Sequence, residues 1–142
     1  MTRGQTCNNL MNIMTTPAFT WQGEIKPTSD LDGFLATFDT IENGIRAGAI
    51  DLLAYYLQDG CDTIQKIITR YAPSGDNPTA NYILFVASHC GVDPGAEIDV
   101  TDNTFLQGLC RAIICFEQGS DCVTDSQLAS GVALALAHRK QS

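Results

Sequence analysis

The chain has few basic side chains and no long apolar run. Its 142 residues include 8 Lys and Arg against 16 Asp and Glu, which gives a formal net charge of −8. Because it has no cluster of cations to displace counterions from a phosphate backbone, we predict that nucleic acid is not a partner. No apolar stretch approaches the roughly 20 residues of a membrane span, and residues 1–30 lack the apolar core of a secretory signal.

Metal-ligand spacing is also missing. The chain has two histidines, and its six cysteines form no CxxC pair. His89 and Cys90 are neighbours on a predicted helix, so they point about 100° apart and make a poor base and nucleophile. We therefore predict no metal and no cofactor, and we expect reduced cysteines that serve mostly as small core residues. They are Cys7, Cys61, Cys90, Cys110, Cys115 and Cys122.

The sequence does have helical periodicity from residue 39 onward. Apolar residues recur at helical spacing in five segments, which predict helices over 39–60, 62–72, 79–91, 102–119 and 124–140. The predicted first residues are Asp39, Asp62, Thr79, Asp102 and Thr124, all of types that cap helix N-termini. A turn over 73–78 and a loop over 91–100 separate the middle helices.

The first 38 residues have a different character. They carry no helical period and are rich in Thr, Asn, Pro and Gly. We expect an irregular segment with at most a short hairpin, packed on a helical body over 39–140. The fold class predicted is mainly α, with one compact domain of about five helices spanning residues 1–142.

Glu117 interrupts this pattern. It follows Ile113 by four positions and Cys110 by seven, so it continues an apolar stripe in the last turn of its helix. An apolar face and the negative end of the helix dipole both disfavour ionisation, which predicts a raised pKa and a carboxylic acid able to donate a proton. The alternative is that the final turn frays and Glu117 turns into solvent.

Several pieces in order along almost the whole chain resemble a family of small bacteriophage proteins described as virion structural proteins. That family begins with Arg-Gly and an Asn-Asn-Pro-Gly-Asn-Ile-like segment. The resemblance implies a virion protein, synthesised in the host cytoplasm, with other virion proteins as partners. The matching pieces include Arg3-Gly4, Asn8 to Ile13, Trp21 to Glu24, Gly44 to Ala47, Thr63 to Pro73, Asp76 to Tyr82, and Ala112 to Gly119.

Two blocks also resemble the lysozyme-like peptidoglycan-cleaving superfamily. The first block consists of the Asn-rich start, residues 34–38 and residues 44–47, and it is similar to the part that follows the catalytic helix in glucosaminidase-type enzymes. The second block, residues 112–119, is similar to the catalytic helix itself, with Glu117 at the position of the catalytic acid. In this chain the catalytic-helix block therefore comes after the other block instead of before it. The resemblance implies a lysozyme-like fold that is circularly permuted, which would require the two chain termini to lie close together. It also implies glycan-strand cleavage, by a peptidoglycan glycosidase or a lytic transglycosylase.

The chain departs from the phage pattern in two places. Leu10-Met11 stands where that family tends to have Pro-Gly, and Phe116-Glu117-Gln118-Gly119 replaces His-Glu-Asn-Gly. A negative net charge also slows the approach of a free enzyme to an anionic cell wall. The alternative function is therefore a non-enzymatic capsid or tail component that uses the same fold for assembly.

Four further residues are candidates for substrate binding. Glu24 and Trp21 could contact a sugar, or they could be a turn residue beside an anchoring tryptophan. Tyr82 falls on an apolar stripe, so it is a core residue unless it lines a saccharide cleft. Arg46 could pair with a carboxylate in a cleft or with one on the surface.

Overall fold

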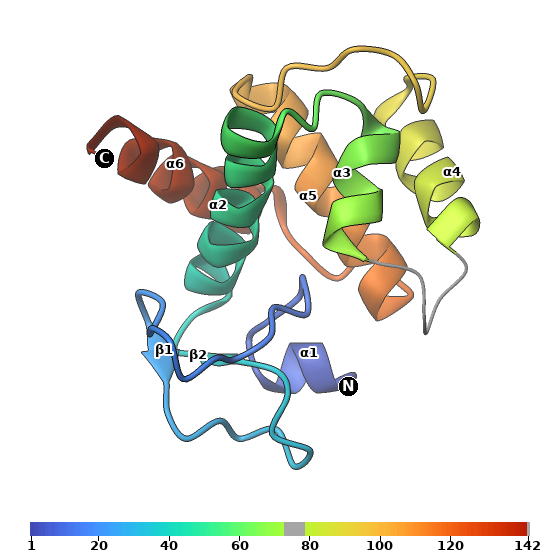
Figure 1. The fold of residues 1–142 in the computed structure, drawn as a ribbon. Coiled ribbons are helices and arrows are strands. Elements are labelled where there is room, and N and C mark those ends of the chain that lie inside the picture. Colours follow the sequence, from blue (N-terminus) through green and yellow to red (C-terminus); the bar gives the residue numbers. More distant parts are fainter. Residues whose placement is uncertain (73–78, 142) are drawn as a thin grey trace.

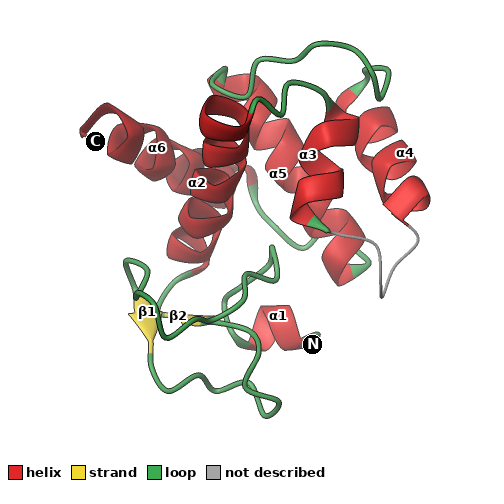
Figure 2. Cartoon of the chain, in the orientation of Figure 1, coloured by secondary structure: helices red, strands yellow, loops and turns green. Residues whose placement is uncertain are grey.

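The computed structural model describes residues 1–72 and 79–141, and helices dominate it (Figures 1 and 2). The mainly helical fold class is therefore confirmed, together with a short hairpin in the N-terminal segment. The turn predicted over 73–78 lies outside the described residues. In chain order the elements are α1 (Arg3–Thr6), β1 (Glu24–Ile25), β2 (Thr37–Phe38), α2 (Ile41–Asp59), α3 (Ile64–Tyr71), α4 (Thr79–Cys90), α5 (Asn103–Gln118) and α6 (Asp125–Gln141).

Two of the predicted helix starts are confirmed by their caps. The Asp102 carboxylate accepts the backbone N–H of Phe105 at 2.9 Å and begins α5. Thr124 and Gln127 form a reciprocal capping box before α6, with N···O distances of 3.1 and 2.9 Å. At the other end of α5, Gly119 adopts the left-handed conformation that ends many helices.

Two other starts are corrected by one residue. The N-cap of α2 is Thr40, whose hydroxyl accepts the backbone N–H of Asn43, and not Asp39. The Asp39 carboxylate instead accepts the side-chain amide of Asn43 at 2.9 Å. For α3 the cap is Thr63 in place of Asp62. Where an acid and a threonine are adjacent, either can cap, and the side chain that reaches the third backbone N–H decides.

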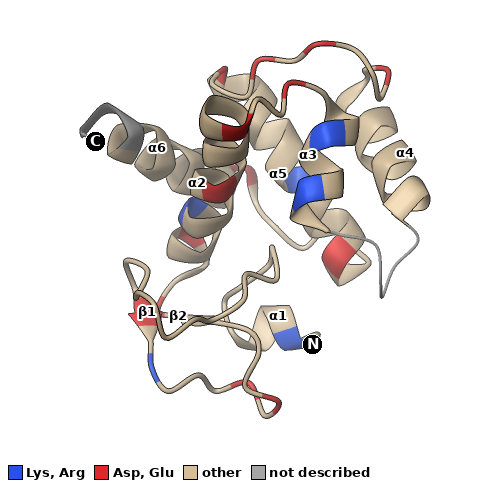
Figure 3. Ribbon diagram, in the orientation of Figure 1, with Lys and Arg blue, Asp and Glu red and all other residues tan. Residues whose placement is uncertain are grey.

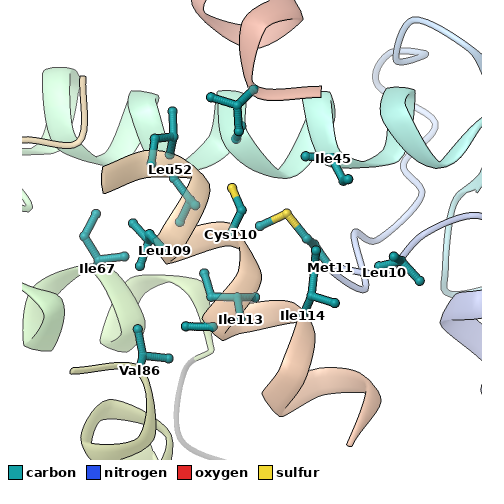
Figure 4. Close-up of a cluster of buried hydrophobic side chains, with 14 of the residues drawn as sticks. Leu10, Met11, Ile45, Leu52, Ile67, Val86, Leu109, Cys110, Ile113 and Ile114 are labelled. Atoms are coloured by element: carbon teal, nitrogen blue, oxygen red, sulfur yellow. The ribbon is translucent and has the colours of Figure 1, made fainter. Parts of the chain in front are cut away.

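One hydrophobic core joins the helices to the N-terminal segment. The helix α2 packs along α6 on one side, and α3, α4 and α5 gather on its other side (Figure 1). Met11 is fully buried and its side chain points between α2 and α5, next to Cys110 and Ile114 (Figure 4). Leu10 is buried beside it. These two residues, where the phage pattern has Pro-Gly, anchor the segment in the core.

Polar contacts hold the N-terminal segment in shape. The buried Asn9 side chain donates to the carbonyls of Ile13 and Ala36, both at 2.8 Å, and accepts the backbone N–H of Ile13. Asp30 binds the Arg3 guanidinium and accepts two backbone N–H groups. The Arg3 hydrogen bonds, followed by those from the backbone, hold the pKa of the Asp30 carboxyl well below its usual range.

The two termini do not lie together. Figure 1 places the N-terminus beside α1 and the C-terminus at the end of α6, on the far side of α2. A circular permutation predicts that the two termini lie close together, and this prediction is wrong for this chain. The physical reason is the direction of α6, which runs along α2 and away from the N-terminal segment.

The charged residues, the hydropathy of the helices and the cysteines can be compared with the expectations from composition. Acidic residues lie in β1, α2, α5 and α6 and in the loops, whereas basic residues are few and scattered (Figure 3). Within residues 1–72 and 79–141, no helix combines the length and the apolar character that crossing a membrane requires. All six cysteines are free thiols. Burial raises the pKa of Cys90 to about 11 and that of Cys110 to about 12, so both stay protonated near neutral pH.

We expect Gly4→Ala to destabilise the protein by about 1–3 kcal/mol, because the added methyl group overfills a packed site. A Cβ at residue 4 would lie 2.5 Å from Gln118 Nε2 and 2.6 Å from Asn12 Oδ1. Urea unfolding measures the change. Gly108→Ala in α5 is the matched control, since no heavy atom lies within 4 Å of its added Cβ. Equal stability of Gly4→Ala and the wild type would show that the contact is not tight.

A candidate acid site at the end of α5

Glu117 lies in the last turn of α5 and is half-buried. Its Oε1 accepts a hydrogen bond from Asn12 Nδ2 at 2.9 Å, and its Oε2 accepts one from the Tyr82 hydroxyl at 2.8 Å. The helix continues to Gln118 and is capped by Gly119, so the final turn that carries Glu117 is helical in the structure. The carboxyl group is thus held between the N-terminal segment and α4.

Asn12 reaches Glu117 because its backbone has a left-handed conformation, with φ at 55°. Asparagine accepts this conformation more readily than most residues do. The Asn12 Oδ1 in turn accepts Gln118 Nε2 at 3.1 Å, and the same Nε2 donates to the Leu10 carbonyl at 2.7 Å. The Thr2 hydroxyl donates to Gln118 Oε1. The amide next to the acid therefore ties three parts of the N-terminal segment to the end of α5.

Tyr82 supplies the second hydrogen bond from the opposite side. It is fully buried in α4, and its ring stacks on Phe116 with centroids 3.9 Å apart and planes 24° from parallel. Burial, followed by the charges of Tyr71 and Glu117, raises the pKa of the Tyr82 hydroxyl. The hydroxyl therefore keeps its proton near neutral pH and acts as a donor to the Glu117 carboxyl.

A groove opens beside Glu117, and we call it the acid groove. Its volume is about 380 Å³. Phe34 and Met14, with 59% and 55% of their surfaces exposed, form an apolar wall from the N-terminal segment. The groove is lined by Thr2, Arg3, Gly4, Asn12, Met14, Phe34, Leu35, Glu117 and Gln118.

The acid has unused hydrogen-bonding capacity toward this groove. A carboxylate offers about four lone-pair positions, and Asn12 and Tyr82 occupy two of them. Because one donor binds each oxygen, the plane of the group is fixed. A ligand in the groove can meet a remaining position on Glu117 without breaking either contact. The arrangement can therefore carry a proton to or from a ligand atom at a defined place.

A second hollow adjoins the first, and we call it the aromatic pocket. It has a volume of about 250 Å³ and shares Asn12 and Met14 with the acid groove. Its polar floor includes Asp51 of α2, whose pKa burial raises to about 6. Its lining consists of Asn12, Ile13, Met14, Phe19, Trp21, Asp51, Tyr55 and Tyr71.

Tyr71 stands within electrostatic reach of both carboxyl groups. Burial raises its pKa well above the usual value, and the charges of Glu117 and Asp51 raise it further. The Tyr71 hydroxyl donates to the Met11 carbonyl. The protein therefore places two carboxyl groups in adjoining hollows, on either side of a protonated tyrosine.

The structure brings some of the predicted site residues together and not others. Tyr82 contacts Glu117, and Trp21 lines the aromatic pocket. Glu24 lines neither hollow: its carboxylate accepts the Thr15 hydroxyl at 2.8 Å and the Trp21 backbone N–H at 3.0 Å. These bonds close the loop that carries the tryptophan.

Arg46 lies apart from both hollows. Only 8% of its surface is exposed, and burial lowers the pKa of its guanidinium. No ion pair joins it to the described part of the chain. Arg46 lines neither the acid groove nor the aromatic pocket, so its role in substrate binding stays a prediction.

Three residues at these hollows were not predicted from the sequence as site residues. Asn12 and Gln118 belong to segments that the phage resemblance included, so that resemblance was the only signal for them. Asp51 lies one turn before Tyr55 on α2, and a carboxylate there is an ordinary feature of a helix surface. Only the fold shows that this side chain faces a pocket.

Another depression lies elsewhere on the molecule. It has a volume of about 850 Å³ and is lined mainly by the end of α2 and by α3. Its cations are already paired, Lys66 with Asp62 at 3.0 Å and Arg70 with Asp59 at 3.3 Å. Across residues 1–72 and 79–141, no group of three or more His, Cys, Asp or Glu could hold a metal ion.

Comparison with known proteins places the chain among phage proteins. No model of a protein family matches it. It is 36% identical over 131 residues to a protein of Pseudoalteromonas phage PM2, an alignment that covers 91% of this chain and 79% of the relative. That relative is called Protein P5, and the chain belongs to its family. The resemblance to bacteriophage proteins is thereby confirmed, whereas the lysozyme-like resemblance stays a prediction.

We expect Asp51→Asn to stabilise the protein near neutral pH, because the amide has no charge to desolvate. The pKa of the folded Asp51 carboxyl, about 6, lies above its ordinary value of 3.8. Below about pH 4 the Asp51 carboxyl is protonated and does not lower the free energy of unfolding. As the pH rises through 6 the partly buried carboxyl ionises, and that part of the free energy of unfolding is lost. Because the side chain is partly exposed, we expect a gain of about 1–2 kcal/mol at pH 7.5 and a small one at pH 4.

Urea unfolding at both pH values measures this difference. Asp59→Asn on the same helix is the matched control, since it removes an acid that pairs with Arg70. We expect no gain from it at either pH. A stability difference between Asp51→Asn and the wild type that does not change with pH would contradict the assignment.

Proposed function

We propose that this phage protein is a virion-associated, lysozyme-like domain that cleaves the glycan strand of bacterial peptidoglycan, with Glu117 as the general acid. The observation that carries the proposal is the placement of Glu117. It is half-buried in the wall of an open groove, and Asn12 and Tyr82 orient it. A positioned carboxyl group of this kind suits the protonation of a leaving glycosidic oxygen.

The proposed reaction begins with the protonated Glu117 giving its proton to the glycosidic oxygen as the C–O bond breaks. The sugar that loses the bond develops oxocarbenium character at its anomeric carbon. No second carboxylate lines the acid groove among the described residues. This favours a lytic-transglycosylase-like or substrate-assisted route, in which a hydroxyl or the acetamido group of the substrate attacks that carbon. In the first route the Glu117 carboxylate accepts the proton of the attacking hydroxyl. In the second, the acetamido oxygen forms an oxazolinium ion, and Glu117 accepts the proton of the water that opens it.

Membership of the Protein P5 family supports a place in the phage particle with other virion proteins. A peptidoglycan-cleaving domain carried by the particle acts where the particle meets the cell wall. The net charge of −8 would slow a freely diffusing enzyme near an anionic wall, but it matters less for a domain delivered by a particle.

A non-enzymatic role in the particle is the second candidate. Exposed apolar side chains gather on the N-terminal segment, where Leu31 is fully exposed and about half of Phe19 and of Ile25 is exposed. Such side chains suit burial against another subunit. A stable contact would need at least about 1,000 Å² of buried surface. In this role Glu117 only fastens the segment to α4 and α5.

We expect Glu117→Gln to lower the clearing of purified peptidoglycan at least 100-fold, because the amide cannot donate the proton that the leaving oxygen needs. The fall in turbidity of a peptidoglycan suspension measures the activity. Glu97→Gln is the matched control, since Glu97 is exposed and lines neither hollow. If the wild type clears nothing, the enzymatic proposal fails and the structural role remains.

We expect Tyr82→Phe to lower kcat about tenfold on soluble glycan fragments with little change in KM. The variant keeps the stacking on Phe116 but removes one of the two donors that orient Glu117. Steady-state kinetics on fragments of defined length measure both constants. A rise in KM at constant kcat would instead make Tyr82 a substrate-binding residue.

A further inference from the structure

Asp51 is unusual among the acidic residues of the chain because it faces a pocket without a partner. No hydrogen bond or ion pair joins its carboxyl to any residue within 1–72 and 79–141. By contrast, Glu24, Asp30 and Glu117 all have their oxygens bound by the protein. A partly buried carboxylate with free lone pairs is most stable when a ligand donates to it.

The walls of the aromatic pocket suit a ring-shaped ligand. Trp21 and Tyr55 present aromatic surface, and Phe19 packs edge-on against Trp21 with centroids 5.0 Å apart and planes 83° apart. This contact fixes the indole, and the bonds from Glu24 fix the loop that carries it. Aromatic surface beside a few directed polar groups is the usual composition of a small-molecule site.

The position of the pocket favours a chain-like ligand. It meets the acid groove at Asn12 and Met14, so a strand that crosses the groove past Glu117 continues into it. No Lys or Arg lines the pocket, and the nearby carboxyl groups repel an anion. An uncharged sugar with hydroxyl and amide donors satisfies both conditions.

We propose that Asp51 and Trp21 form a binding site for a neighbouring sugar of the glycan strand, beside the bond that Glu117 cleaves. In this site an Asp51 carboxylate oxygen accepts a hydrogen bond from a hydroxyl or amide N–H of the sugar, and Trp21 packs against the ring. The inference rests on the proposed function and adds to it a residue that binds substrate without taking part in the proton transfer.

The test uses a tetramer of N-acetylglucosamine and the Glu117→Gln protein, which is expected not to cleave it. Trp21 is the one tryptophan of the chain, so its fluorescence reports on this pocket alone. We expect the tetramer to change the emission of Trp21 in a saturable way. Adding Asp51→Asn should weaken binding about 5–30-fold, because the sugar then donates to a neutral amide oxygen and no longer to a charged carboxylate. This variant is not expected to unfold, since removing the buried charge stabilises it.

Adding Asp59→Asn in place of Asp51→Asn is the matched control, and it should leave the affinity unchanged. Calorimetric titration gives the Kd independently of fluorescence. Tetramer binding that neither changes Trp21 emission nor depends on Asp51 would overturn the proposal. The proposal is also overturned if the wild type clears peptidoglycan but the Glu117→Gln protein does not bind the tetramer. In that case the proposed function still stands. Binding at Trp21 by a protein whose wild type clears nothing would support the sugar site and reject the cleavage.

Discussion

The amide of Gln118 links the N-terminal segment to the end of α5, and both hollows depend on this joint. Its Nε2 donates to the Leu10 carbonyl and to Asn12, and its Oε1 accepts the Thr2 hydroxyl. These groups are largely removed from water, so leaving any one of them unpaired costs about 1–3 kcal/mol. Gly4 permits the close approach, because a larger residue would meet the same amide. The joint therefore has essentially one arrangement.

This arrangement explains how an irregular segment can form one wall of a defined site. Asn12 is held by Gln118 on one side and binds Glu117 on the other. Met11, the preceding residue, is anchored in the core between α2 and α5. Met14, two residues after Asn12, lines both the acid groove and the aromatic pocket where the two meet. A few residues of loop thus acquire the rigidity that is usually provided by helices or strands.

The helices could be predicted from the sequence because their apolar residues repeat at a period that local geometry imposes. Their first residues were less certain, since Asp39 and Thr40 are both good caps and only the contacts of Asn43 separate them. The helix α1 has four residues, which is too short for any period to show. The N-terminal segment is held by polar contacts between distant residues, and such contacts leave no periodic signal.

The same distinction applies to the site. Glu117 was predictable because a carboxyl group in an apolar stripe breaks a local rule. Its partner Asn12 lies 105 positions away along the chain, so no local pattern connects them. Asp51 breaks no rule on its own helix, and only the fold of residues 12–21 over α2 converts it from a surface acid into the floor of a pocket. Tertiary placement, and not residue type, defines that half of the site.

The positions of the two termini have a practical consequence for handling the protein. Thr2 and Arg3 line the acid groove, so an affinity tag fused ahead of Met1 would emerge at the rim of that groove. The end of α6 lies across the molecule (Figure 1), beyond the helix that carries Asp51. Coupling the protein to a sensor chip or bead through its C-terminus therefore leaves both hollows facing the solution.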